Sequence, residues 1–406
     1  MRTRCDDLKL EAEPLNHLGS LEPAIRAMRD HRPLDLNAEI WRAAHPGGAF
    51  ADWRAAARAC LRGSMTYDPG PLDLRPEVLK REERDGLIRE LVAFNTAPWF
   101  RVKGWFLRPI GSRGRLPGLV VFHEWGGPIL FGKERVTDSG RDSFVLADHR
   151  ARAAGGRYLA DEFARAGYAV IVIDAFYFGE RGPRGFNGIP AEFDPFEMSS
   201  FDCWGTHQRV VEQLYVTLRG LIWAGVTWMG ILFADDVRCL DYLQSRPEVD
   251  PERLGCTGLS VGAWRTNVLG ALDARGKAAV SACWMTTGDY QHLHNLAGAI
   301  GGPFALLPGV WDRLDVPDLP IMSAPCASMV ISGAKDIMFP VEGQQEAARQ
   351  IRAGYEWAGC PARFKHVNPP KPHCYDVELQ KEAIAWFDRH LKPGSGAQRG
   401  QAASLG

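Results

Sequence analysis

Short continuous apolar segments alternate with amphipathic helical segments along most of this chain. The apolar segments lie at residues 116–122, 168–176, 253–259, 277–287, 326–333 and 362–370. A strand without polar alternation is buried on both faces, so this order predicts an α/β fold with a mostly parallel central sheet and helices on both faces. Residues 87–94 and 99–107 alternate in part between apolar and polar positions, which predicts an antiparallel pair that begins the sheet.

One of these segments ends in a serine between two glycines. Ser260 follows "LGCTGL" and precedes a small-residue helical pattern, with Gly258 and Gly262 on either side. The pattern G-x-S-x-G is weak by itself, but a strand–turn–helix context is the one in which such a serine acts as a nucleophile. The alternative is a serine that only caps a helix. Ligands of open parallel sheets bind beyond the carboxyl ends of the strands, which favours the nucleophile.

Two more polar residues follow later predicted strands. Asp336 comes after "SMVISG", and His373 comes after "FKHVNPP" at the start of the last helix. The order Ser260, Asp336, His373 is the chain order of the α/β-hydrolase triad. A histidine takes the serine proton, and a carboxylate orients that histidine and stabilises its charged form. His366 is a rival base, but it lies inside the strand pattern.

The loop after residues 116–122 is the expected source of an oxyanion donor. A tetrahedral intermediate needs at least two preorganised N–H groups, and the backbone N–H groups of Trp125 and Val261 are the candidates. Two kinds of role are open for Glu124. It could hydrogen-bond the serine or shape the loop, or it could be a structural carboxylate that supports the residues around the site. His123, Tyr177, Trp264 and Trp284 are further candidates for the wall of the site or for its support.

Composition narrows the class of protein. Of 406 residues, 46% are hydrophobic and 24% are charged, and the formal net charge is -1, which predicts an ordinary globular protein without a nucleic-acid or membrane partner. Nine scattered cysteines and an N-terminus without an apolar core favour a reduced, cytoplasmic location. Residues 220–234 form an apolar run too short to span a membrane, so a buried core helix is expected.

The chain divides into three predicted parts. Residues 1–80 contain helical pieces and form an N-terminal helical extension, and residues 75–86 are expected to be a charged connection. Residues 81–392 form the catalytic domain, in which residues 181–206, rich in glycine, proline and aromatics, are a candidate lid or pocket wall. Residues 393–406 are expected to be disordered. A homodimer formed through the extension remains open.

Other polar clusters after strands are expected to be mainly structural. Asp174, Glu180 and Arg181 follow one strand, where an Asp or Glu could touch substrate, but a structural loop in which Glu180 and Arg181 pair locally is favoured. Asp289, His292 and His294 follow another, but two histidines at i and i+2 on a loop are a weak metal pattern, and no metal site is expected.

"HEWGG", "VDPERLGCTGLSVGAW", "GAKDIMFP" and "PHCYDVELQKEAIAWFDRHL" together resemble the dienelactone-hydrolase-like and acetyl-xylan-esterase-like branch of the α/β-hydrolases, over about residues 85–392. The resemblance implies the fold and a serine triad, with no metal or organic cofactor. Dienelactone hydrolases proper use a cysteine nucleophile, whereas this chain has Ser260. Ala263 also stands where relatives often have another glycine.

These observations predict a serine hydrolase that cleaves a small-molecule carboxylic ester or lactone through an acyl-enzyme. Three alternatives stay open: an amidase or peptidase on the same triad, a C–C bond hydrolase, and a catalytically silent fold that serves as a binding protein.

Overall fold

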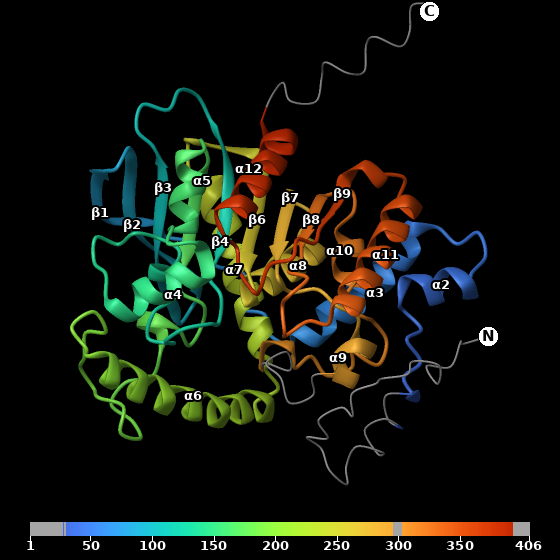
Figure 1. Ribbon diagram of the computed structural model, residues 1–406, viewed down its shortest axis with the longest axis horizontal. Helices are drawn as coiled ribbons and strands as arrows, with labels where there is room; N and C mark the ends of the chain where they lie inside the picture. The colour runs from blue at the N-terminus through green and yellow to red at the C-terminus, as the bar shows by residue number, and fades with distance from the viewer. Residues whose placement is uncertain (1–26, 28–29, 295–302, 393–406) are drawn as a thin grey trace, which may run out of the picture.

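A nine-stranded sheet forms the centre of the molecule (Figure 1). The computed structural model describes residues 27, 30–294 and 303–392. The strands are β1 (Glu77–Arg84), β2 (Leu87–Ala97), β3 (Phe100–Pro109), β4 (Leu116–Phe122), β5 (Ala169–Ile173), β6 (Val249–Leu259), β7 (Gly276–Ala282), β8 (Ala327–Ile331) and β9 (Phe364–Val367). Their order across the sheet is β1-β2-β3-β5-β4-β6-β7-β8-β9. The six strands from β4 to β9 are parallel to one another. The strand β3 pairs with β5 antiparallel, and β2 and β1 continue the sheet antiparallel beyond β3, as the sequence pattern predicts.

Helices cover both faces of this sheet. They are α2 (Ala38–Ala44), α3 (Phe50–Met65), α4 (Phe144–Ala154), α5 (Leu159–Arg165), α6 (Ser200–Trp223), α7 (Trp228–Ser245), α8 (Val261–Leu272), α9 (Gly288–His294), α10 (Asp318–Ser323), α11 (Val341–Trp357) and α12 (Val377–Leu391). Helices α5 and α12 pack on one face, and α7 and α8 pack on the other. Helices α6 and α9 lie along the lower edge of the sheet in Figure 1.

The strand β4 shows why the central strands are apolar at every position. Leu119 and Val121 belong to the core beneath α5 and α12, whereas Val120 and Phe122 belong to the core beneath α7 and α8. Successive side chains of a strand point to opposite faces, so a strand covered on both sides needs no polar position. The strand β6 lies in this doubly covered centre of the sheet and ends at Leu259, directly before Ser260.

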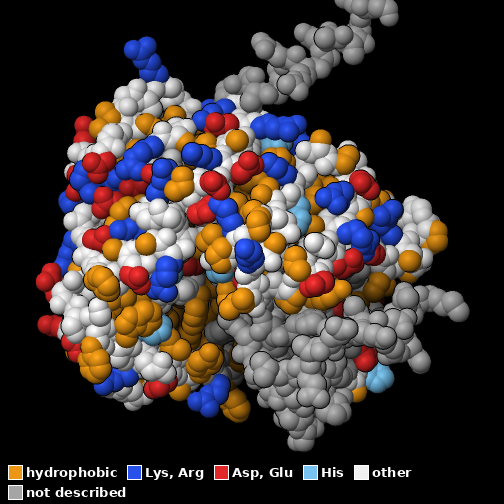
Figure 2. Space-filling view, in the orientation of Figure 1, with side chains coloured by type: hydrophobic (Ala, Val, Ile, Leu, Met, Phe, Trp, Pro, Cys, Tyr) orange, Lys and Arg blue, Asp and Glu red, His pale blue; other side chains and the backbone are white. Residues whose placement is uncertain are grey.

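The sequence pattern was wrong in two places. Residues 75–86 are not a plain connection, because β1 occupies most of them as an exposed edge strand with mostly charged side chains (left side of Figure 2). The apolar run 220–234 is not one buried helix: it is divided between α6, whose Trp223 is 94% exposed, and α7, which begins at the buried Trp228. The two helices are bent by 89°. Because α6 begins at Ser200, it also takes in the end of segment 181–206.

The described part of the N-terminal region packs on the helices that cover the sheet. Its helices α2 and α3 contact α7, α8, α10 and α11. The indole of the fully buried Trp53 donates a hydrogen bond to Leu36 O at 2.7 Å. A domain boundary at residue 80 stays a prediction, and β1 crosses that position. Residues 393–406 lie outside the described residues.

In the part of the chain that the structure describes, no single helix has both the length and the apolar character needed to cross a membrane. The bent pair α6 and α7 meets that test only when the two helices are taken together.

Candidate active site

Ser260 occupies the turn between β6 and α8 in a conformation that serine rarely adopts. Its φ is 57° and its ψ is -118°, and its N–H donates to Ala282 O at 2.8 Å. A left-handed φ is costly for a residue with a side chain, so the surrounding contacts must impose it. The turn is the one that the G-x-S-x-G pattern predicts.

The glycines beside Ser260 allow this turn to be tight. A Cβ at Gly258 would lie 2.6 Å from the carbonyl carbon of Gly262, and a Cβ at Gly262 would lie 2.5 Å from Phe122 O. Neither distance is sterically possible without movement of backbone. The start of α8 therefore packs directly against the end of β4, where the loop of residues 123–128 begins.

Asp336 and His373 contact each other beyond β8 and β9. His373 Nδ1 and Asp336 Oδ2 are 2.6 Å apart, and Asp336 also accepts a hydrogen bond from Met338 N at 3.0 Å. Their two loops are joined by backbone hydrogen bonds from Ala334 N to Pro369 O and from Lys335 N to Lys371 O. The sequence prediction that these two side chains meet is thus matched by their geometry.

His366 lies elsewhere. It is part of β9, and its buried Nε2 has no hydrogen-bond partner among the described residues. Burial lowers the pKa of this histidine to about 4, so the ring is neutral near pH 7. The structure shows no pairing between His366 and a carboxylate, in contrast to His373.

The loop after β4 is fixed by His123. Ala175 N donates to His123 Nε2 at 3.0 Å, so the ring proton is on Nδ1, which lies 2.9 Å from Glu124 O. Burial lowers the pKa of His123 to about 3. The neutral ring therefore joins this loop to the chain that follows β5, which is a structural role.

Glu124 pairs with His149 of α4 by a short contact between its carboxylate and His149 Nε2. Burial alone would raise the pKa of Glu124, but the bond and charge of His149, with the charge of Arg135, outweigh burial and lower the pKa to about 2. A Cβ at Gly127 would lie 2.8 Å from the ring of His149, so the loop rests on that ring. Glu124 thus shapes the loop.

Arg135 fixes the same loop by donating hydrogen bonds to the backbone carbonyl groups of the loop. The buried guanidinium donates to Glu124 O at 2.9 Å and also bonds Gly126 O and Pro128 O. Five N–H donors in a planar fork suit this task, which a lysine could not perform. Sequence analysis missed Arg135 and His149, because neither belongs to a recognisable motif or follows a strand.

The two candidate oxyanion donors come from α8 and from the loop of residues 123–128, which pack against each other. Val261 is the first residue of α8, where backbone N–H groups lack intrahelical partners. Trp125 follows Glu124 in the loop that Arg135 clamps, and its side chain is half-buried. The assignment of both N–H groups to an oxyanion stays a prediction.

The other predicted wall residues are buried aromatics. Trp264 and Trp284 are in ring contact at 5.5 Å. Tyr177 is buried with a φ of 82°, and its hydroxyl accepts a hydrogen bond from Thr217 at 3.4 Å.

The polar residues that follow β5 and β7 have structural partners. Asp174 forms a buried ion pair with Lys133 at 2.9 Å, and Lys133 also bonds Glu180 at 2.7 Å. Asp289 is paired with Arg32 at 2.7 Å, whereas the side chains of His292 and His294 lie outside the described residues.

Among the described residues, one cluster has ligand atoms close enough for a metal ion. Cys283, Asp336 and His373 offer atoms within 4.8 Å of one another. The atoms of Asp336 and His373 are already joined by a hydrogen bond, and burial raises the pKa of the Cys283 thiol, which keeps it protonated. Metal ligands must be deprotonated, so this cluster suits a metal poorly.

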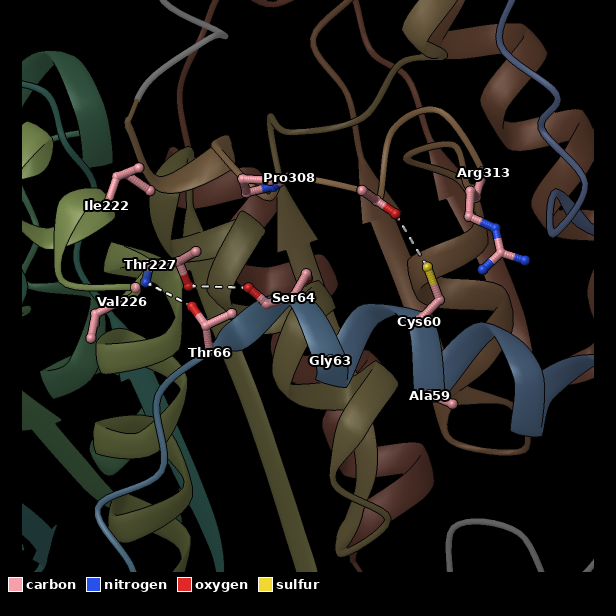
Figure 3. Close-up of a pocket in the computed structure, with 12 residues that line it drawn as sticks. Ala59, Cys60, Gly63, Ser64, Thr66, Ile222, Val226, Thr227, Pro308 and Arg313 are labelled. Carbon is pink, nitrogen blue, oxygen red and sulfur yellow. Dashed lines mark hydrogen bonds between the residues drawn. The ribbon is translucent and has the colours of Figure 1, made fainter.

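Figure 3 shows a hollow of about 410 Å³ at the junction of α3, α6 and α7. None of the predicted site residues lines it. Two polar groups of its wall are bonded to protein: Thr227 Oγ1 donates to Ser64 O at 3.3 Å, and Thr227 N donates to Thr66 Oγ1 at 3.1 Å. The hollow is therefore distinct from the candidate active site.

Comparison with known proteins supports the fold. No family model matches the chain. A Bacillus subtilis protein named "Putative hydrolase YtaP" is 25% identical over 328 residues, which are 79% of this chain and 94% of that protein.

The solved structures that resemble the chain include a "putative acetyl xylan esterase" from Bacteroides fragilis, with a TM-score of 0.63 and 17% identity over 89% of this chain and 84% of that one. A glucuronoyl esterase from Solibacter usitatus has a TM-score of 0.58 and 15% identity over 87% and 93% of the two chains. The chain has the α/β-hydrolase fold that its sequence predicts.

Proposed function

We propose that this protein is a serine hydrolase that cleaves a small carboxylic ester or lactone. The observation that carries the proposal is the combination of Ser260 in a strained turn with the Asp336–His373 pair, all three at the carboxyl ends of parallel strands. The resemblance to YtaP and to the two esterases supports the same class of reaction.

The proposed reaction has two halves. Ser260 Oγ attacks the carbonyl carbon while His373 Nε2 takes its proton, and Asp336 accepts the Nδ1 hydrogen bond of the imidazolium. The negative oxygen is held by the N–H groups of Val261 and Trp125. The intermediate collapses, the alcohol leaves with the proton from His373, and an acyl group stays on Ser260. Water activated by His373 then releases the acid and restores the serine.

The hydrogen bonds from Arg135 to the loop of residues 123–128 explain how the oxyanion donors would be preorganised. Arg135 bonds three carbonyl oxygens of residues 124–128. A loop whose carbonyl oxygens are already bonded is held in one conformation, so its N–H groups would not have to reorganise when they bind an oxyanion.

A fluorophosphonate probe tests the proposal. It should label wild-type protein on the peptide that contains Ser260, and Ser260→Ala should remove both labelling and hydrolysis of 4-nitrophenyl acetate, by about 10³-fold or more. Ser332→Ala is the matched control, since Ser332 is also a buried serine directly after a parallel strand. Labelling of another serine, with Ser260 unmodified, would reject the assignment, and no labelling at all would favour a silent binding protein.

A further inference from the structure

A continuous series of aromatic rings connects the candidate oxyanion loop with the candidate base. The ring centroids of Trp125 and Phe304 are 6.1 Å apart. Those of Phe304 and Trp284 are 5.1 Å apart, and those of Trp284 and Phe339 are 5.4 Å apart. Phe339 stacks on His373 at 6.2 Å with an angle of 12°. These four aromatic residues, from Trp125 to Phe339, are called the aromatic belt below. They come from four separate loops, so the belt is assembled only at this edge of the sheet.

The buried charged groups beside the belt are already paired within the protein. Asp336 bonds His373, Glu124 bonds His149, and Arg135 bonds backbone carbonyls. An anionic group on a substrate would thus meet apolar rings without a free cation among these residues. Bringing a charge against such a wall without a partner is unfavourable. The site therefore suits a neutral ligand.

Trp125 is the ring of the belt that is open to a ligand. The rings of Phe304, Trp284 and Phe339 are at most 4% exposed, whereas Trp125 is half-buried. Phe178 and Trp228 meet the Trp125 ring at 82° and 77°, which fixes its orientation.

We infer that the substrate is a neutral ester that carries a planar aromatic group, and that the indole of Trp125 selects it. This inference rests on the proposed function. An aromatic ring meets other rings through offset-stacked or edge-to-face contacts, which a saturated ring of similar size cannot make. Trp125 would thus serve twice: its backbone N–H holds the oxyanion, and its side chain contacts the aromatic group of the same ester.

Matched substrates isolate the effect of planarity. Benzyl acetate and cyclohexylmethyl acetate have similar leaving groups and differ in the ring, and ethyl phenylacetate with ethyl cyclohexylacetate tests the acyl side in the same way. Wild-type protein should favour the aromatic member of one pair by about threefold to tenfold in kcat/KM. The pair that shows the preference identifies the side of the ester that lies on the belt. The carboxylate derivative 4-(acetoxymethyl)benzoate should react at least about tenfold more slowly than benzyl acetate.

Substitution of Trp125 tests the residue. Trp125→Leu keeps the backbone N–H and removes the aromatic face, so the ratio of kcat/KM between the aromatic and the saturated ester of the pair should fall toward one, whatever the change in the overall rate. Trp125→Phe should keep part of the preference. Trp99→Leu is the control, because Trp99 is 64% exposed and outside the belt.

The outcomes separate this inference from the proposed function. Equal kcat/KM within both pairs in wild-type protein overturns the inference while leaving an ester hydrolase. An unchanged ratio in a folded Trp125→Leu protein overturns the role of Trp125. Absence of hydrolysis and of probe labelling in wild-type protein overturns the proposed function itself. If Trp125→Leu does not fold, the wild-type ratios and the Trp125→Phe protein still decide the question.

Discussion

At the scale of single residues, position after a strand was the informative signal. Ser260, Asp336 and His373 each follow a buried strand, and the carboxyl ends of parallel strands meet at one edge, so their proximity could be expected before the structure was known. Arg135 and His149 could not be found in this way. They act through backbone carbonyls and through Glu124, and such contacts depend on how two loops fold together rather than on any spacing in the sequence.

The two histidines near the end of the sheet give a direct comparison. His373→Ala should lower kcat on 4-nitrophenyl acetate by about 10³-fold or more, because it removes the proposed base. His366→Ala should leave kcat within about threefold, since the pKa of His366 is lowered by burial to about 4 and its ring has no carboxylate partner. Steady-state kinetics of both proteins decide this. If His366→Ala were the inactive protein, the assignment of the base would be wrong.

At the scale of elements, the interior of the sheet was predictable and its edge was not. The strands β4, β5 and β8 are buried and mostly apolar, and β6 and β7 are buried over their second parts, a pattern that is typical of a sheet covered on both faces. The edge strand β1, "EVLKREER", is mostly exposed and charged, so its sequence resembles a loop. Charged side chains on an edge strand oppose pairing with another molecule, which explains the composition physically.

Helix α8 contains two glycines that should respond differently to the same substitution. Gly262→Ala should lower both stability and probe labelling of Ser260, because its Cβ would lie 2.5 Å from Phe122 O and push the loop of residues 123–128 away. Gly270→Ala should be neutral or stabilise by up to about 1 kcal/mol, since its Cβ would be 3.4 Å from Ser323 Cβ and alanine favours helix. Urea unfolding and labelling rates measure both effects. Equal behaviour of the two proteins would contradict the proposed close packing.

At the scale of the whole molecule, the N-terminal helices join the rest of the fold through a buried carboxyl group. Asp318 of α10 is fully buried and accepts hydrogen bonds from Ala38 N at 2.9 Å and from Asp315 N at 2.8 Å. Burial raises the pKa of Asp318 to about 7 despite these bonds. This contact could not be predicted from any local pattern, because it joins residues 280 positions apart.

The stability of the protein should therefore depend on pH through Asp318. The folded state holds this proton more tightly than the unfolded chain, whose ordinary pKa is 3.8, so the stabilising contribution is complete below about pH 4 and is lost as pH rises to about 7. In Asp318→Asn the free energy of unfolding should fall less steeply from pH 5 to 7, by up to about 1.4 kcal/mol per pH unit.

Urea unfolding at several pH values measures this slope. Asp52→Asn is the control, since Asp52 is exposed on α3 and its loss should leave the slope unchanged. A slope in Asp318→Asn equal to that of wild-type protein would show that the buried carboxyl group does not titrate in this range.

The position of β9 at the edge of the sheet determines which residue of the candidate site should be displaced first on heating. This strand has four residues and pairs only with β8. The strand β6, which ends directly before Ser260, lies between β4 and β7 in the middle of the sheet. Edges of a structure open locally at a lower cost than its core. Detachment of β9 would withdraw His373 while the nucleophile stays in place. Mild heat should thus abolish the proposed hydrolysis reversibly before the molecule unfolds, because this short edge strand is expected to detach first.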